Sequence, residues 1–101
     1  MPWIRVCGVD ELPEGEATKI EAKIDVAVFN VDGEFFATQD VCSHGSASLA
    51  DGFIVDGDKI ECPLHQGTFD ITTGKAVGIP CKIDLRTYAV KVENGNIFIK
   101  E

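Results

Sequence analysis

Residues 26–38 read VAVFNVDGEFFAT, two runs rich in β-branched and aromatic side chains on either side of an Asp-Gly pair. Side chains of these types favour extended strands. Asp32 and Gly33 both tolerate a positive φ, which a two-residue hairpin turn requires. This stretch therefore predicts an antiparallel β-hairpin.

Two more hairpins are predicted, each with a glycine at the turn. Their strands and turns are 53–55 and 59–61 around Asp56-Gly57-Asp58, and 88–92 and 96–100 around Asn94-Gly95. A turn at Thr72-Thr73-Gly74 and one helical turn around Ser46–Leu49 are also predicted. Many short strands, with no repeat or linker between them, indicate an all-β chain built as a small antiparallel sandwich or barrel.

The composition limits the functions that the chain can have. Its 101 residues fit one domain, 1–101, and 45% apolar residues suit a folded globule. Nine basic against 17 acidic residues leave a formal charge of −8. This charge excludes a binder of duplex nucleic acid or of an anionic membrane, and it favours a partner with a basic surface. The plainer alternative is that the acidic residues only aid solubility.

Neither a membrane span nor a secretory leader is predicted. No apolar run approaches the roughly 18 residues that cross a bilayer. The N-terminus also lacks the apolar core of a leader peptide. We therefore expect a cytoplasmic protein, and in a reducing cytosol clustered cysteines indicate metal binding or catalysis.

The chain has two histidines, and each stands close to a cysteine. Cys42-Ser43-His44 and Cys62-Pro63-Leu64-His65 are separated by residues 45–61. Each pair follows a predicted strand and therefore lies on a loop, and the hairpin between them can bring the two loops together. Two buried cysteines and two ordinary polar histidines would be the simple alternative. The paired arrangement instead predicts a metal site.

The way in which the ligands are shared narrows the choice of metal. Zinc fingers usually take a cysteine pair from one segment and a histidine pair from another. Here each loop supplies one residue of each type. That interleaving suits two irons, one bound by a thiolate from each loop and the other by an imidazole from each loop.

On this motif the chain resembles the Rieske ferredoxins over essentially its whole length, and above all the small ferredoxins of bacterial aromatic-ring dioxygenase systems. The resemblance implies one [2Fe-2S] cluster, held by a subdomain of two loops within residues 40–70. Cys42 and Cys62 would bind the buried iron, and His44 and His65 the outer iron. The resemblance also implies that four further residues surround the cluster: Gly45, Gln66, Gly67 and Pro80. Pro80 matches a proline loop of the family, although an ordinary strand break is an alternative.

Four substitutions relative to the respiratory Rieske proteins bear on the reduction potential. Ala47 and Leu64 occupy the positions of their disulfide, and Gly67 and Phe69 replace a serine and a tyrosine hydroxyl. Fewer hydrogen bonds to the sulfurs stabilise the reduced cluster less. We expect a potential in the lower part of the Rieske range, which runs from about −150 to about +300 mV.

The resemblance implies an electron carrier and not an enzyme. All four ligands come from side chains, and no further histidine remains for a catalytic triad. The carrier would take electrons from an NADH-dependent flavoprotein ferredoxin reductase and pass them to a terminal Rieske oxygenase. We expect a monomer that docks through the histidine edge, with Leu64 and Pro80 in contact.

Two other functions are compatible with this sequence. One is the small Rieske-like subunit of an assimilatory nitrite reductase, and the other is a zinc-stabilised binding module. The remaining cysteines, Cys7 and Cys81, are expected to be unreactive thiols, with a disulfide between them as the alternative.

Overall fold

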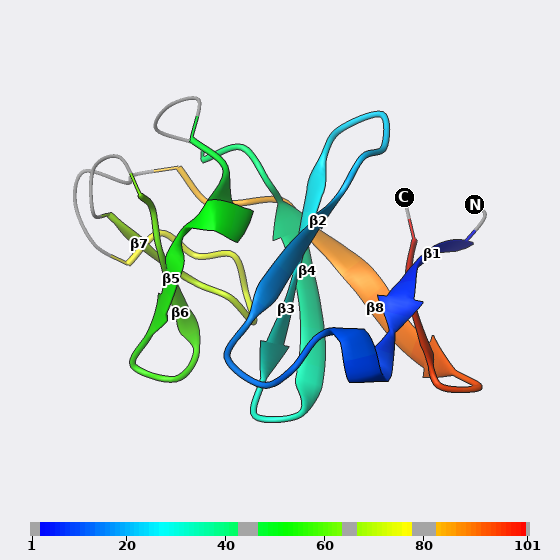
Figure 1. Cartoon of the computed structure of the whole chain (residues 1–101). Coiled ribbons are helices and arrows are strands. Elements are labelled where there is room, and N and C mark those ends of the chain that lie inside the picture. The colour runs from blue at the N-terminus through cyan, green and yellow to red at the C-terminus, as the bar shows by residue number, and fades with distance from the viewer. Residues whose placement is uncertain (1–2, 43–46, 64–66, 78–82, 101) are drawn as a thin grey trace.

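The computed structural model describes residues 3–42, 47–63, 67–77 and 83–100. Within these ranges the backbone is built mainly of antiparallel strands in two sheets, with two single-turn 3-10 helices (Figure 1). The predicted all-β, antiparallel fold is confirmed.

The larger sheet has six strands, and it curls. Its order is β1-β9-β8-β4-β3-β2. The strands are β1 (Trp3–Gly8), β2 (Ala17–Ile20), β3 (Val26–Val31), β4 (Glu34–Gln39), β8 (Thr87–Glu93) and β9 (Asn96–Lys100).

The smaller sheet has three strands in the order β5-β6-β7. They are β5 (Phe53–Val55), β6 (Lys59–Glu61) and β7 (Thr68–Asp70), and the 3-10 helices are η1 (Val9–Glu11) and η2 (Leu49–Asp51). Figure 1 shows this sheet at one end of the molecule and β1 at the other.

All three predicted hairpins form, and for the predicted reason. Asp32, Asp56 and Asn94 each have a φ of 52°. The glycine that follows each of them has a positive φ as well, between 76° and 90°. Local turn chemistry therefore fixes β3–β4, β5–β6 and β8–β9.

The predicted helical turn is displaced along the chain. The described helical turn spans Leu49–Asp51, and Ser46, the first residue of the predicted turn, lies outside the described residues. Ser48 is extended instead, because it pairs with Val41 in an antiparallel bridge. Strands β2 and β7 and helix η1 were not predicted, since none of them belongs to a hairpin with a glycine-containing two- or three-residue turn.

Strand β3 is buried on both faces and separates two hydrophobic cores. Ala27 and Phe29 pack into a core that includes Ile60 and Phe69 of the small sheet. Val26 and Val28 face a second core inside the curl of the large sheet. The small sheet is thus attached to the large one through one face of β3.

Candidate metal centre

The first cysteine begins a loop whose two ends are hydrogen-bonded together. The Cys42 N–H donates to the Ala47 carbonyl at 2.9 Å. On the outer side of this bond, Val41 pairs with Ser48, and the Leu49 N–H donates to the Asp40 carbonyl at 2.7 Å. Residues 42–47 therefore form a loop with fixed ends.

The second cysteine begins a loop that is closed in the same way. The Cys62 N–H donates to the Gly67 carbonyl at 2.8 Å. Glu61 pairs with Thr68, and Ile60 pairs with Phe69. Each of these paired positions lies twenty residues after a paired position of the first loop. The backbone pairing of residues 40–49 is therefore repeated at 60–69, and we call each of these two segments a frame. The sequence shows no repeat, but the backbone has one.

Both cysteine thiols lie at the same position of their frames and are buried. Cys42 is 2% exposed and Cys62 is 0% exposed. They belong to one core cluster together with Leu49, Ile60 and Phe69. Two buried thiols on matched loops fit the sulfur-ligated end of an iron–sulfur cluster, because such an iron is held by thiolates away from water.

The described residues account for only part of the predicted site. Besides the two cysteines, Gly67 is described, and it is buried. His44, Gly45, His65, Gln66 and Pro80 lie outside the described residues, as do Leu64 and Cys81. Among the described residues alone, no group of three or more potential metal ligands comes together.

The described residues on either side of 78–82 are hydrogen-bonded to the small sheet or to the turn that follows it, and one of them lies next to the second loop. On one side, the Val77 N–H donates to the carbonyl of Thr68, the residue after the loop, at 2.9 Å. On the other side, the Leu85 N–H donates to the Gly74 carbonyl at 2.7 Å. These contacts bring both flanks of residues 78–82 to the small sheet or to the turn that follows it.

Two residues that sequence analysis missed hold the frames in place. Gly52 lies so close to β6 that a Cβ atom there would be 2.2 Å from the Glu61 carbonyl oxygen. Asp40 is 2% exposed, and its carboxylate accepts a hydrogen bond from the Ser48 hydroxyl. The only available signals were a glycine before a strand and a charged residue two positions before a cysteine.

Comparison with known proteins identifies the family. A model of the Rieske [2Fe-2S] domain matches residues 2–89. The chain belongs to the Rieske [2Fe-2S] domain family.

Among relatives of this Rieske protein are ferredoxin subunits. The 3-phenylpropionate/cinnamic acid dioxygenase ferredoxin subunit of Photorhabdus laumondii is 50% identical over 99 residues, which cover 98% of this chain and 94% of that protein. The protein of the same name from Escherichia coli strain K12 is 49% identical over 98% of this chain and 93% of its own.

Solved structures agree with this assignment. The Sphingomonas yanoikuyae B1 ferredoxin superposes with a TM-score of 0.92 at 43% identity, and the match covers 99% of each chain. A chain from the complex of reduced oxygenase and oxidized ferredoxin in carbazole 1,9a-dioxygenase gives 0.92 at 36% identity over 96% and 91%. A nitrite reductase small subunit from Mycobacterium tuberculosis gives 0.86 at 22% identity, which shows a shared fold only.

No helix among the described residues is long and apolar enough to cross a membrane.

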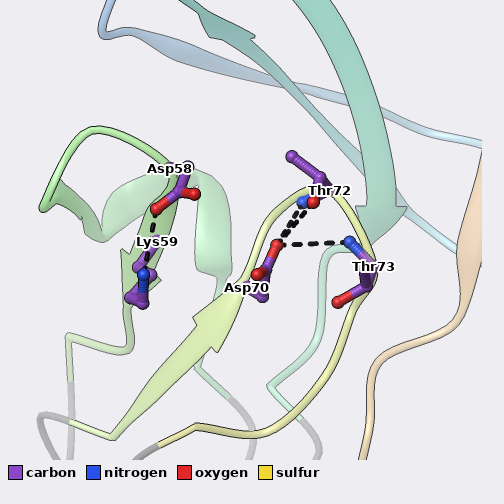
Figure 2. A network of polar contacts seen from close by, with 5 residues as sticks. All are labelled: Asp58, Lys59, Asp70, Thr72 and Thr73. Carbon is purple, nitrogen blue, oxygen red and sulfur yellow. Dashed lines mark hydrogen bonds and ion pairs between the residues drawn. The ribbon is translucent and has the colours of Figure 1, made fainter.

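Charged side chains gather on the part of the small sheet farthest from the cysteine loops (Figure 2). Lys59 pairs across the strands with Asp70 and forms an ion pair with Asp58 at 3.0 Å. The hydrogen bond to Asp58 raises the pKa of Lys59 above its usual value. Hydrogen bonds lower the pKa of Asp70, first from the Thr72 hydroxyl and then from the Thr72 and Thr73 amides, with a smaller contribution from Lys59.

The depressed pKa of Asp70 predicts a pH-dependent contribution to the stability of the Rieske domain. Its charge stabilises the folded state above the pKa of an unfolded aspartate, about 3.9, and this contribution is lost as the pH falls through the folded value. We expect Asp70→Asn to unfold at a lower temperature than the wild type at about pH 7, with the gap narrowing at about pH 3. Thermal denaturation checks this, with exposed Asp51→Asn as the control. A gap that stays constant with pH would contradict it.

Cys7 lies far from the two ligand loops, on β1, which is at the opposite end of the molecule from the small sheet in Figure 1. It is a half-buried free thiol. Burial, followed by the nearby Glu11 charge, raises the pKa of the Cys7 thiol. A raised pKa keeps the thiol protonated, which fits the expected lack of reactivity. The alternative disulfide would involve Cys81, outside the described residues.

Proposed function

We propose that this Rieske protein is the one-electron carrier of a multicomponent aromatic-ring dioxygenase. It would take electrons from an NADH-dependent flavoprotein ferredoxin reductase and deliver them to a terminal Rieske oxygenase. The observation that carries this proposal is the pair of buried cysteines on two matched loops, in a chain whose relatives are named as dioxygenase ferredoxin subunits. Those relatives are electron-transfer subunits and not catalytic ones.

We assign the cluster ligands as Cys42, Cys62, His44 and His65, with Gly45, Gln66, Gly67 and Pro80 around them. When bound, the cluster supplies a site that accepts and releases one electron. The chain's own residues define its surroundings. Leu49, Ile60 and Phe69 exclude water from the two thiols, and Phe69 carries no hydroxyl that could donate to a sulfur.

A row of paired residues crosses the small sheet next to the second ligand loop, with exposed Phe53 and Val77 at its two ends. Phe53 pairs with Glu61, which pairs with Thr68. Val77 is hydrogen-bonded to Thr68 and continues the row. Facing residues on adjacent strands lie about 5 Å apart on one face of a sheet. Phe53 and Val77 are 63% and 53% exposed, respectively, which suits the small apolar contact of a brief electron-transfer encounter.

This row predicts a measurable effect on partner binding. Phe53→Ser should raise the ferredoxin concentration needed for half-maximal oxygenase turnover about five- to tenfold, because an aromatic side chain that becomes buried on binding often anchors an interface. The turnover rate at saturation should stay unchanged, since the ligand loops are intact. Val92→Ser is the matched control, because Val92 is 51% exposed beside the distant Asn94-Gly95 turn. Equal effects of the two variants would contradict a docking role for the row.

The function itself is tested by reconstitution. The purified protein should be red-brown, contain iron and acid-labile sulfide, and sustain NADH-dependent dihydroxylation when mixed with a dioxygenase reductase and oxygenase. A colourless, zinc-containing protein would instead indicate the binding module. Co-purification with a large sirohaem subunit would indicate the nitrite reductase subunit. Sedimentation tests the expected monomer, and fractionation tests the expected cytoplasmic location.

A further inference from the structure

Asp40 is a buried carboxylate to which the assigned site gives no role. It directly follows β4 and is 2% exposed. It is the only buried residue with an ionisable carboxyl or amino group among those that the structure describes. Within the same ranges, no ion pair includes it. Burying a carboxylate is costly unless hydrogen bonds compensate, so its bonding partners indicate what it does.

Those partners lie on the far side of the first ligand loop. The Oδ1 atom of Asp40 accepts from the Ser48 hydroxyl at 2.9 Å and from the Ala50 N–H at 3.0 Å. The Asp40 carbonyl accepts from the Leu49 N–H at 2.7 Å. Its own N–H donates to the Asp25 carbonyl at 2.9 Å, which ties this point to the large sheet. One residue therefore joins the chain before Cys42 to the chain after Ala47.

A comparison with the second ligand loop explains why the first loop needs these hydrogen bonds from Asp40. The counterpart of Asp40 in the second frame is Ile60, whose aliphatic side chain makes no hydrogen bond. The chain there is held instead by β6 and β7, which continue as paired strands beyond this position. In the first frame the chain turns into η2 at Leu49, so strand pairing stops after Ser48. The carboxylate of Asp40 accepts hydrogen bonds from the residues just after the first loop, where strand pairing has ended.

We propose that Asp40 is a positioning residue that fixes the two ends of the loop 42–47, and with them the place of the Cys42 thiol. The inference rests on the proposed cluster ligation by Cys42. The ends of the first ligand loop would then be held by one side chain, whereas the ends of the second are held by strand pairing in the small sheet. Hydrogen bonds around metal ligands commonly set ligand orientation. Loss of the Asp40 hydrogen bonds should therefore alter the surroundings of the metal centre.

The test compares Asp40→Ala with Asp40→Asn, because the asparagine oxygen can still accept both hydrogen bonds. In the reconstituted protein, Asp40→Ala should change the EPR g-values and the midpoint potential, and Asp40→Asn should restore the wild-type g-values. The Ala50 amide should exchange with solvent about tenfold faster in Asp40→Ala, as expected for the loss of one hydrogen bond to a charged group.

Asn30→Ala is the matched control for a purely structural effect. Asn30 is 5% exposed and braces a different part of the chain, through the Leu12 carbonyl and the Gly33 N–H, each at 2.8 Å. It should lower the melting temperature without changing the g-values. If Asp40→Ala fails to fold, Ser48→Ala removes one of the two donors and should shift the g-values in its place.

The outcomes separate this inference from the proposed function. Unchanged g-values in a cluster-containing Asp40→Ala, or in Ser48→Ala if the first variant does not fold, would overturn the positioning role alone. A shift in Asp40→Asn as large as in Asp40→Ala would also overturn it, because charge and not hydrogen bonding would then be responsible. A wild-type protein without iron would overturn the proposed function.

Discussion

Replacing Cys62 with alanine should abolish cluster binding completely. Cys62 is fully buried at the end of β6, and its loop is closed by its own backbone bond to Gly67. No other cysteine of the described chain lies at an equivalent position except Cys42, which the proposed site already uses. Iron and acid-labile sulfide should fall to background, and the visible spectrum should be lost. The variant should also melt at a lower temperature, because a ligand bound only by the folded state stabilises it.

Cys7→Ala provides the control for this experiment. It removes a partly buried thiol from β1 at the far end of the molecule and should leave the iron and sulfide content unchanged. A Cys62→Ala protein that retains the full iron content would refute the ligand assignment. Equal iron loss in both variants would point to general misfolding as the cause.

A large effect on stability is expected at Gly52, a glycine outside the ligand set. Gly52→Ala would place a Cβ atom 2.2 Å from the Glu61 carbonyl oxygen and 3.2 Å from that of Leu49. Both obstacles are backbone atoms, so η2 must move away from β6. We expect a loss of about 2 kcal/mol in the free energy of unfolding, which lowers the melting temperature by roughly 8–16 °C.

Gly8→Ala separates this clash from the general effect of adding a methyl group. Its nearest obstacle is the Oε1 atom of Glu11 at 3.1 Å, the far end of a flexible side chain that can move. Thermal and urea unfolding of both variants should show a small change for Gly8→Ala and a large one for Gly52→Ala. Comparable changes would mean that the approach of η2 to β6 can relax at little cost.

The hairpins could be predicted from the sequence because their turns are specified locally. Asp32-Gly33 and Asn94-Gly95 adopt the positive φ values that their residue types allow. Strand β7 and the hydrogen bonds of Asp40 could not be predicted, because they join the two sides of a ligand loop and no turn motif in the local sequence specifies them. The same holds for Gly52. No side chain fits at this position, and this is apparent only once η2 packs on β6.

For the candidate site, the Cys and His spacing predicted that four residues come together. The structure places two of them, Cys42 and Cys62, in one buried cluster, and His44 and His65 lie outside the described residues. The shared frame of the two loops was not visible, because it consists of backbone bonds and the histidines sit at different offsets, His44 and His65. Side-chain identity at the matched positions differs, as with Asp40 and Ile60, although the backbone pairing is the same.

The double-sided burial of β3 has a consequence for how the molecule comes apart. Phe29 belongs to the core that holds the two thiols, while its neighbour Val28 belongs to the other core. Neither half can therefore melt while the other remains intact, since losing this one strand opens both. Heating should release iron and erase the far-ultraviolet circular dichroism in a single step, so bleaching of the visible colour would serve as a direct gauge of denaturation.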